Sequence, residues 1–366
     1  MDMRVKNSLG AVDGGEMVNR AIWLLIAAVA VAVGVSAIFL NFTIVWRSYF
    51  VLTTACLLLM GAAWLYRTWR NDQSIAAVLE GTSQLTAFTA VAAPLSYIAA
   101  SANRPLQDSA FAAADKFLHF DWMALLGWMN AHPSLHPIFA LAYASFVPQT
   151  IVALMALAMT GHSARIRQFL LTFILTALVT IAISAWLPAQ GAWAHYGITP
   201  ADHPAIAPVT REIHLAIFDG LRSGSFQLLT GINSEGIITF PSLHAAVALI
   251  FILTLWPVPV LRWVGLIVNV LMIIATPIDG GHYLIDVFAG LGLAALCWVG
   301  VSWLVTNRTS TILDPANVSL PQSQDAPSMA FVLSASDVNS LEHDAEQCEA
   351  VFGQHHALTY ENRSRL

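Results

Sequence analysis

Two short polar motifs interrupt an otherwise apolar chain, and each carries a histidine. The later motif, GHYLID at residues 281–286, places His282 and Asp286 four residues apart at the start of an apolar stretch. Four residues are about one helical turn, so both side chains share a face and the carboxylate accepts one ring N–H. The other ring nitrogen of His282 is then free to act as a nucleophile or a base.

The earlier motif, FPSLH at residues 240–244, precedes another apolar stretch. Proline is favoured in the first turn of a helix, and Ser242 is suited to cap that helix through its hydroxyl. Gly281, directly before His282, lets a ligand approach the backbone. Helix N-termini present unpaired N–H groups to anions. We therefore expect two helix N-termini, with His244 and His282, to converge on one phosphoryl group.

Each histidine also has a structural interpretation. His244 alone fits a hydrogen-bonded histidine at a helix end, and the pair His282–Asp286 fits a structural N-terminal hydrogen bond. Ionisable residues at the edge of a membrane span are costly and usually functional, which favours the catalytic interpretation. A zinc site, with additional ligands drawn from His195, His203 and His214, or a haem held by two helix histidines is a further alternative.

Composition places the chain among membrane proteins. Of 366 residues, 57% are hydrophobic and 10% are charged, and the mean hydropathy is +0.67. Soluble domains carry about 25% charged residues. The net charge is -6, and -5 of it lies in residues 307–366, which hold eight acidic and three basic side chains. The rest offers no electropositive surface, which excludes nucleic acid as a partner. The three cysteines indicate neither a disulfide framework nor a zinc cluster.

Hydropathy predicts an all-α polytopic fold of about eight transmembrane helices. The expected spans are 21–40, 49–66, 83–103, 135–159, 168–188, 240–256, 261–278 and 283–305. Residues 1–20 form an N-terminal tail, 21–82 two leading helices, and 83–305 a six-helix membrane domain with long connectors at 104–134 and 189–239. Residues 306–366 form an acidic tail whose composition predicts disorder. The first span is too long for a signal-peptide core, so we expect it to be retained.

The distribution of Lys and Arg predicts the orientation. With the N-terminus inside, inner segments hold nine basic residues near the membrane and outer segments hold five. Both histidine motifs and Arg104 then fall on the outer face. We expect a multi-pass protein of a bacterial inner membrane with its active site on that face.

The two motifs resemble those of the type 2 phosphatidic acid phosphatase superfamily. The form FPSLH followed by HYLID is most similar to its inositol phosphorylceramide synthase branch, as are RPLQD (104–108) and DKFLHFDW (115–122). The resemblance implies that His282 attacks phosphorus to form a phosphohistidine, that Asp286 orients it, and that His244 protonates the leaving alcohol. It implies no metal or other cofactor.

The resemblance also implies groups that bind the phosphoryl oxygens. We assign these to Ser242 and Gly281, with Arg104 as the first cationic candidate and Arg222 as the second. Arg104 also fits an interfacial anchor. The chain departs from the common pattern at two places: residues 275–276 are Ala-Thr instead of Ser-Arg, and Tyr97 stands where a lysine is expected.

The implied function is phosphoryl transfer from a phospholipid or isoprenoid phosphate, with water or a lipid alcohol as acceptor. The transferase branch is favoured by motif form, and a lipid phosphate hydrolase is the alternative. A non-enzymatic lipid transporter or scaffold is an alternative from another class, although no internal repeat is evident.

The remaining polar and aromatic residues of the connectors have ordinary interpretations. Asp108, Asp115 and Asp121 are expected to be solvated on amphipathic turns, with binding of a polar head group or an ion as the alternative. Tryptophans near the span ends, such as Trp122 and Trp193, are expected to form an interfacial belt.

Overall fold

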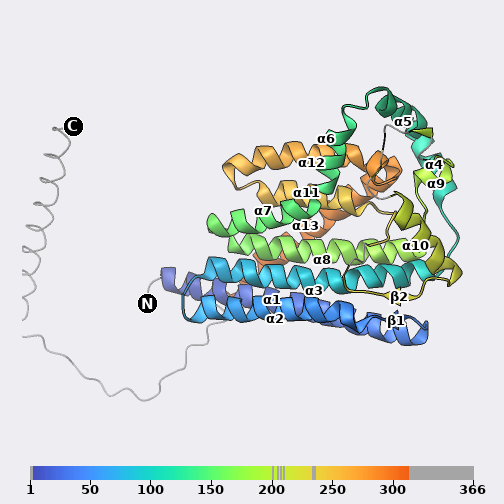
Figure 1. The fold of residues 1–366 in the computed structure, drawn as a ribbon. Coiled ribbons are helices and arrows are strands. Elements are labelled where there is room, and N and C mark those ends of the chain that lie inside the picture. Colours follow the sequence, from blue (N-terminus) through green and yellow to red (C-terminus); the bar gives the residue numbers. More distant parts are fainter. Residues whose placement is uncertain are drawn as a thin grey trace, which may run out of the picture. The chain divides into compact units, whose positions relative to one another are not determined.

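A computed structural model of the chain describes residues 3–199, 202–203, 206, 208, 211–232 and 236–312. This part is almost entirely helical (Figure 1). The helices are α1 (Met3–Phe39), α2 (Trp46–Thr68), α3 (Gln73–Ser101), α4 (Asp108–Phe117), α5 (Trp122–Ala131), α6 (His136–Ala144), α7 (Phe146–Met159), α8 (Ser163–Trp186), α9 (Ala192–His195), α10 (Arg211–Ser223), α11 (Leu243–Leu255), α12 (Pro259–Asp279) and α13 (Leu284–Ile312). Most of the predicted acidic tail, 306–366, lies outside the described residues.

The predicted polytopic all-α fold is confirmed. Six helices are long and apolar enough to span a membrane, namely α1 from Gly15 onward, α2, α3, α8, α12 and α13. Helices α6 and α7 meet at a bend of 54° and add a seventh span if they are counted as one. The described residues therefore hold six or seven candidate spans instead of eight. The difference between seven and eight is α11, which has 13 residues where about 20 are needed to cross a bilayer.

Some predicted limits differ from the helix ends. Helix α1 begins at Met3, inside the segment expected to be an N-terminal tail, and α3 begins ten residues before the predicted start at 83. Local sequence explains the starts of other helices. Asp72 caps α3 by accepting the N–H groups of Ser74 and Ile75. Helix α12 begins with Pro259, which suits a first helical position.

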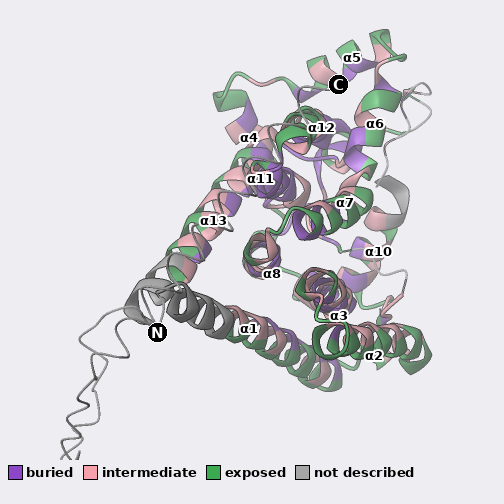
Figure 2. Cartoon of the chain, turned by 90° about the vertical axis from the view of Figure 1, so that its left-hand side faces the viewer, coloured by how far each residue is buried: buried purple, intermediate pink, exposed green. Residues whose placement is uncertain are grey.

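Helix α8 lies in the middle of the bundle. It contacts α1, α3, α7, α11 and α13, and Figure 2 shows it enclosed when the bundle is viewed from one end. Its buried face carries Phe169, Leu170 and Phe173, which belong to the largest hydrophobic cluster. Helix α2, by contrast, packs on α3 and exposes most of its apolar surface. Such exposure is expected of a helix that faces lipid.

The two long connectors lie at the same end of the bundle (Figure 1). Connector 104–134 forms α4 and α5, and connector 189–239 includes α9, α10 and strand β2 (Leu228–Leu229). Strand β2 pairs in parallel with β1 (Thr43–Ile44), which lies between α1 and α2. Helices α11 and α13 both begin at this end, so the fold brings the two histidine motifs together.

Candidate active site

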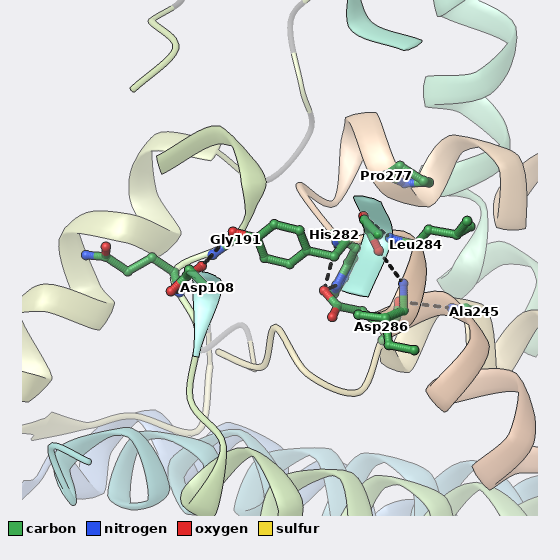
Figure 3. A network of polar contacts seen from close by, with 12 residues as sticks. Asp108, Gly191, Ala245, Pro277, His282, Leu284 and Asp286 are labelled. Carbon is green, nitrogen blue, oxygen red and sulfur yellow. Dashed lines mark hydrogen bonds and ion pairs between the residues drawn. The ribbon is translucent and has the colours of Figure 1, made fainter. Parts of the chain in front are cut away.

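His282 and Asp286 are in contact at the start of α13 (Figure 3). His282 lies two residues before the helix and Asp286 lies in its first turn. The distance from His282 Nδ1 to Asp286 Oδ2 is 3.4 Å, and the two side chains are 5% and 0% exposed. The predicted contact is therefore present. The Nε2 atom of His282 is the ring nitrogen that does not face the carboxylate.

His244 is the second residue of α11 and packs against aromatic rings from the bent pair α6–α7. Its ring stacks on Tyr143 with centroids 4.0 Å apart and an angle of 16° between planes. The ring of Phe146 meets it edge-on at 5.9 Å. The bend between α6 and α7 brings both rings to the histidine, and this packing fixes the plane of its imidazole.

Two cavities meet beside the histidines. The polar cavity, of about 620 Å³, lies against connector 189–239, and Gln190, Thr199, Asp219 and Thr239 contribute to its lining. The apolar cavity, of about 500 Å³, has walls from α3, α7 and α8, and its lining includes Phe88, Ala92, Phe146, Phe173, Ala177 and Ile181. His244 and His282 line the apolar cavity, and Gly281 lines the polar one.

Three residues, His214, Ile238 and Gly280, line both cavities and mark where they meet. His214 comes from α10, and the sequence offered it only as a zinc ligand. Three histidines, on α10, on α11 and just before α13, therefore border these two adjoining cavities. Among the described residues, no group of three or more His, Cys, Asp or Glu side chains has the arrangement of a metal site.

The start of α13 is held by carboxylates from two places. Asp115, on α4, accepts the N–H groups of Leu284 at 2.8 Å and Ile285 at 2.9 Å. Asp286 accepts the N–H of Tyr283 at 2.9 Å. We expected these N–H groups to be open to an anion, and that expectation was wrong. They already bind carboxylates, so the helix terminus positions His282 instead.

Asp108, at the start of α4, links connector 189–239 to the residues just before α13. Its Oδ1 accepts the Tyr283 hydroxyl at 3.0 Å and the Gly191 N–H at 2.9 Å, and its Oδ2 accepts the Gln190 N–H at 3.0 Å. Burial raises the pKa of the Tyr283 hydroxyl, and the Asp108 carboxylate raises it further. The hydroxyl therefore stays protonated and donates.

Both aspartates were predicted to be solvated, and this was wrong. Asp108 is 6% exposed and Asp115 is 1% exposed. Burial raises the pKa of Asp115, while its two backbone donors lower it. Asp121 does remain exposed and caps α5 through the N–H of Ala124. The resemblance of the segment around Asp115 to a family segment was the one sequence signal for a role in the site.

Two tryptophans bind the end of α12, directly before the loop that carries His282. Trp122 Nε1 donates to the carbonyl of Pro277 at 3.2 Å, and Trp193 Nε1 donates to that of Ile278 at 2.7 Å. They are 1% and 6% exposed, so the predicted interfacial belt does not include them. Gly281 has a φ of +66°, and an added Cβ would lie 2.9 Å from Trp193 Cδ1. Glycine is therefore required there by backbone and by space.

Helix α11, which follows the FPSLH motif, begins later than predicted. Helix α11 starts at Leu243, so Pro241 precedes the helix, and Ser242 caps it by accepting the Ala245 N–H at 3.4 Å. Ser242 is fully buried, and its N–H donates to the Asp286 carbonyl at 3.0 Å. Ser242 thus links the two motifs through backbone and side chain, and it does not line either cavity.

The two candidate arginines are not among the residues that line the cavities beside the histidines. Arg104 is exposed, and its guanidinium stacks over Trp186 at 3.9 Å, as expected of an interfacial anchor. Arg222 lies over Phe218 at 5.4 Å. Neither lines the polar or the apolar cavity, and Tyr97 is buried in a hydrophobic cluster. Within the described side chains, His214 is the basic residue that borders the histidine pair.

Comparison with known proteins places this site within a family region. A family model described as the PAP2 superfamily matches residues 109–300, slightly more than half of the chain. The match includes both histidine motifs, connector 189–239, and connector 104–134 from residue 109 onward. No curated protein and no solved structure matches the chain.

Proposed function

The chain belongs to the PAP2 superfamily, and from this premise we propose that it is a membrane enzyme that transfers the phosphoryl-containing head group of a lipid phosphate ester through a phosphohistidine at His282. The observation that carries the proposal is the arrangement of His282, His244 and Asp286 where a polar and an apolar cavity meet. A head group fits the polar side and an acyl or isoprenoid chain fits the apolar side.

In the first step His282 Nε2 attacks phosphorus, a P–N bond forms, and the P–O bond to the leaving alcohol breaks. The negative charge of a bound phosphoryl group favours the protonated form of His244, which donates its proton to the departing oxygen. Asp286 accepts the Nδ1–H of His282, which fixes the tautomer and stabilises the imidazolium that develops. Their 3.4 Å separation is long for such a bond, and catalytic hydrogen bonds commonly shorten when substrate is bound.

In the second step an acceptor hydroxyl gives its proton to His244 and attacks phosphorus. The P–N bond breaks, and both histidines return to their starting states. Water as the acceptor makes the enzyme a lipid phosphatase. A ceramide or diacylglycerol-like alcohol makes it a transferase of the inositol phosphorylceramide type, which the form of the two motifs favours.

Negative charge on the phosphoryl oxygens needs donors, and the described side chains of the site offer few cations. His214 borders both cavities, so we assign it to the phosphoryl oxygens in place of Arg104 and Arg222. The excess of basic residues on the segments predicted to be inner supports an outer-facing site in a bacterial plasma membrane.

A product assay tests the function. The full-length protein in lipid vesicles, without added metal, receives labelled phosphatidate, phosphatidylinositol or a polyprenyl diphosphate, each with and without ceramide or diacylglycerol. Free phosphate without acceptor identifies a phosphatase, and a new phospholipid that requires acceptor identifies a transferase.

Two variants accompany the assay. His282→Ala should abolish both turnover and the labelled phosphoenzyme, whereas His132→Ala, an exposed histidine at the end of α5, should behave as wild type. Turnover that persists in His282→Ala contradicts the mechanism. Substrate binding without any turnover favours a transporter or scaffold.

A further inference from the structure

A second polar pocket lies at the end of the bundle opposite the histidines. It has a volume of about 80 Å³ and is formed by α1, α2, α3 and α8. The polar side chains of Asn19, Arg67, Glu80, Gln84 and Arg167 contribute to its lining. Glu80 and Ser96 are 16 residues apart on α3, and Ser96 lines the apolar cavity, so about 24 Å of helix separates the two sites.

The pocket carries more positive than negative charge. Arg67 Nη2 is 2.7 Å from Glu80 Oε2, and Asn19 Nδ2 donates to the same oxygen at 2.8 Å. Glu80 is thereby neutralised in a site where its side chain is 8% exposed. The guanidinium of Arg167 lies against the backbone of α1, since a Cβ at Gly15 would be 2.9 Å from Nη2. Among the described side chains, Arg167 makes no ion pair, which leaves one positive charge in excess.

Gln84 supplies the second observation. It is completely buried and lines the pocket, and neither its amide nitrogen nor its amide oxygen has a hydrogen-bond partner among the described residues. A buried polar group without a partner is unfavourable, so such groups usually face a ligand or water. The pocket has room for either, because a water molecule takes up about 30 Å³ of liquid.

We propose that this pocket binds a phosphate-bearing anion, supplied by the head group of an anionic phospholipid in the membrane leaflet at that end. Arg167 provides a forked pair of donors that matches phosphate oxygens, and the Gln84 amide adds a third donor. A cation is disfavoured because Glu80 is already occupied by Arg67 and Asn19. A lipid source is favoured because all four helices are candidate spans that end here. This site shares no residue with the proposed reaction.

Thermal unfolding of the full-length protein in detergent tests the site. The His282→Ala background is used so that no lipid is consumed. The probes are a short-chain phosphatidylglycerol, the matching phosphatidylcholine, and inorganic phosphate. Phosphatidylglycerol should raise the melting temperature more than phosphatidylcholine, and Arg167→Gln should weaken its apparent affinity at least ten-fold. Arg70→Gln, an exposed arginine at the same end, is the matched control and should retain the shift.

Each outcome bears on the proposal. A shift with inorganic phosphate that also needs Arg167 supports the anion site with a free ion as its ligand. Equal shifts in the Arg167→Gln and Arg70→Gln proteins, or equal shifts from both lipids, overturn the proposal. If Arg167→Gln does not fold, Gln84→Leu and Arg167→Lys replace it. Both should reduce the affinity for phosphatidylglycerol, and wild-type affinity in both refutes the site.

Discussion

Replacing Asp115 by alanine tests whether α4 holds the loop that carries His282. Asp115 accepts the N–H groups of Leu284 and Ile285 and is 1% exposed. The substitution removes both acceptors from the first turn of α13. A fully buried N–H left without an acceptor costs about 1–3 kcal/mol, and these two are partly buried, so the free energy of unfolding should fall by at most roughly 2–6 kcal/mol.

Catalysis should suffer more than the loss of stability explains, because Leu284 is only two residues from His282. A displacement of about 1 Å at a reacting group costs on the order of 100-fold in rate. We therefore expect the kcat of Asp115→Ala to fall about 100-fold, with a smaller change in KM. Asp115→Asn keeps one acceptor oxygen and should lie between this variant and wild type.

Asp72→Ala is the matched control. Asp72 caps α3 through two N–H groups, those of Ser74 at 3.1 Å and Ile75 at 3.0 Å, at the opposite end of the bundle. Loss of this more accessible cap should cost roughly 0.5–2 kcal/mol and leave kcat unchanged. The assay is the turnover of each variant in vesicles, below its melting temperature. Wild-type kcat in Asp115→Ala, or equal losses in the two variants, refutes the reasoning.

Three further substitutions test individual groups of the site. His244→Ala should slow turnover by about 10²–10⁴-fold with an alkyl leaving group, and a p-nitrophenyl ester should recover most of that rate; absence of recovery contradicts the general-acid role. Asp286→Asn should lower kcat by about 10⁴-fold without unfolding the protein, since the amide favours the wrong tautomer, and near-normal kinetics would exclude an orienting role. Gly281→Ala should lower the melting temperature and activity because of its positive φ and the nearby Trp193 ring. Gly292→Ala, in open space on α13, should change neither the melting temperature nor the activity. A larger loss in Gly292→Ala than in Gly281→Ala would contradict this account.

The contact between His282 and Asp286 could be predicted because it is local. A spacing of four residues at a helix start determines which side chains meet, whatever the rest of the fold does. The helical segments were predictable for a similar reason, since an apolar stretch in a membrane protein must satisfy its backbone within itself. The length of α11 could not be predicted, because apolar residues before and after the helix extend the hydropathy signal beyond its ends.

The groups that hold the loop could not be predicted, because their partners are far away in sequence. Asp115 and Leu284 are 169 residues apart, and nothing local distinguishes Asp115 from the exposed Asp121. Trp193 was predicted to be interfacial because it is a tryptophan close to the end of a predicted span. Its burial depends on the end of α12, where Ile278 accepts its indole N–H, and only the tertiary fold brings that helix to it.

The boundary of the family match is not a boundary of the folded unit. The matched region begins at residue 109, yet Ser96 Oγ accepts the N–H of Ile237 at 3.0 Å, and Ser48 Oγ accepts that of Gly231 at 2.8 Å. Strand β1 pairs with β2 in the same region. A chain trimmed to the matched residues would lose these partners and the α3 wall of the apolar cavity. The matched region thus contains both motifs but lacks helices and a strand that form the surroundings of the site.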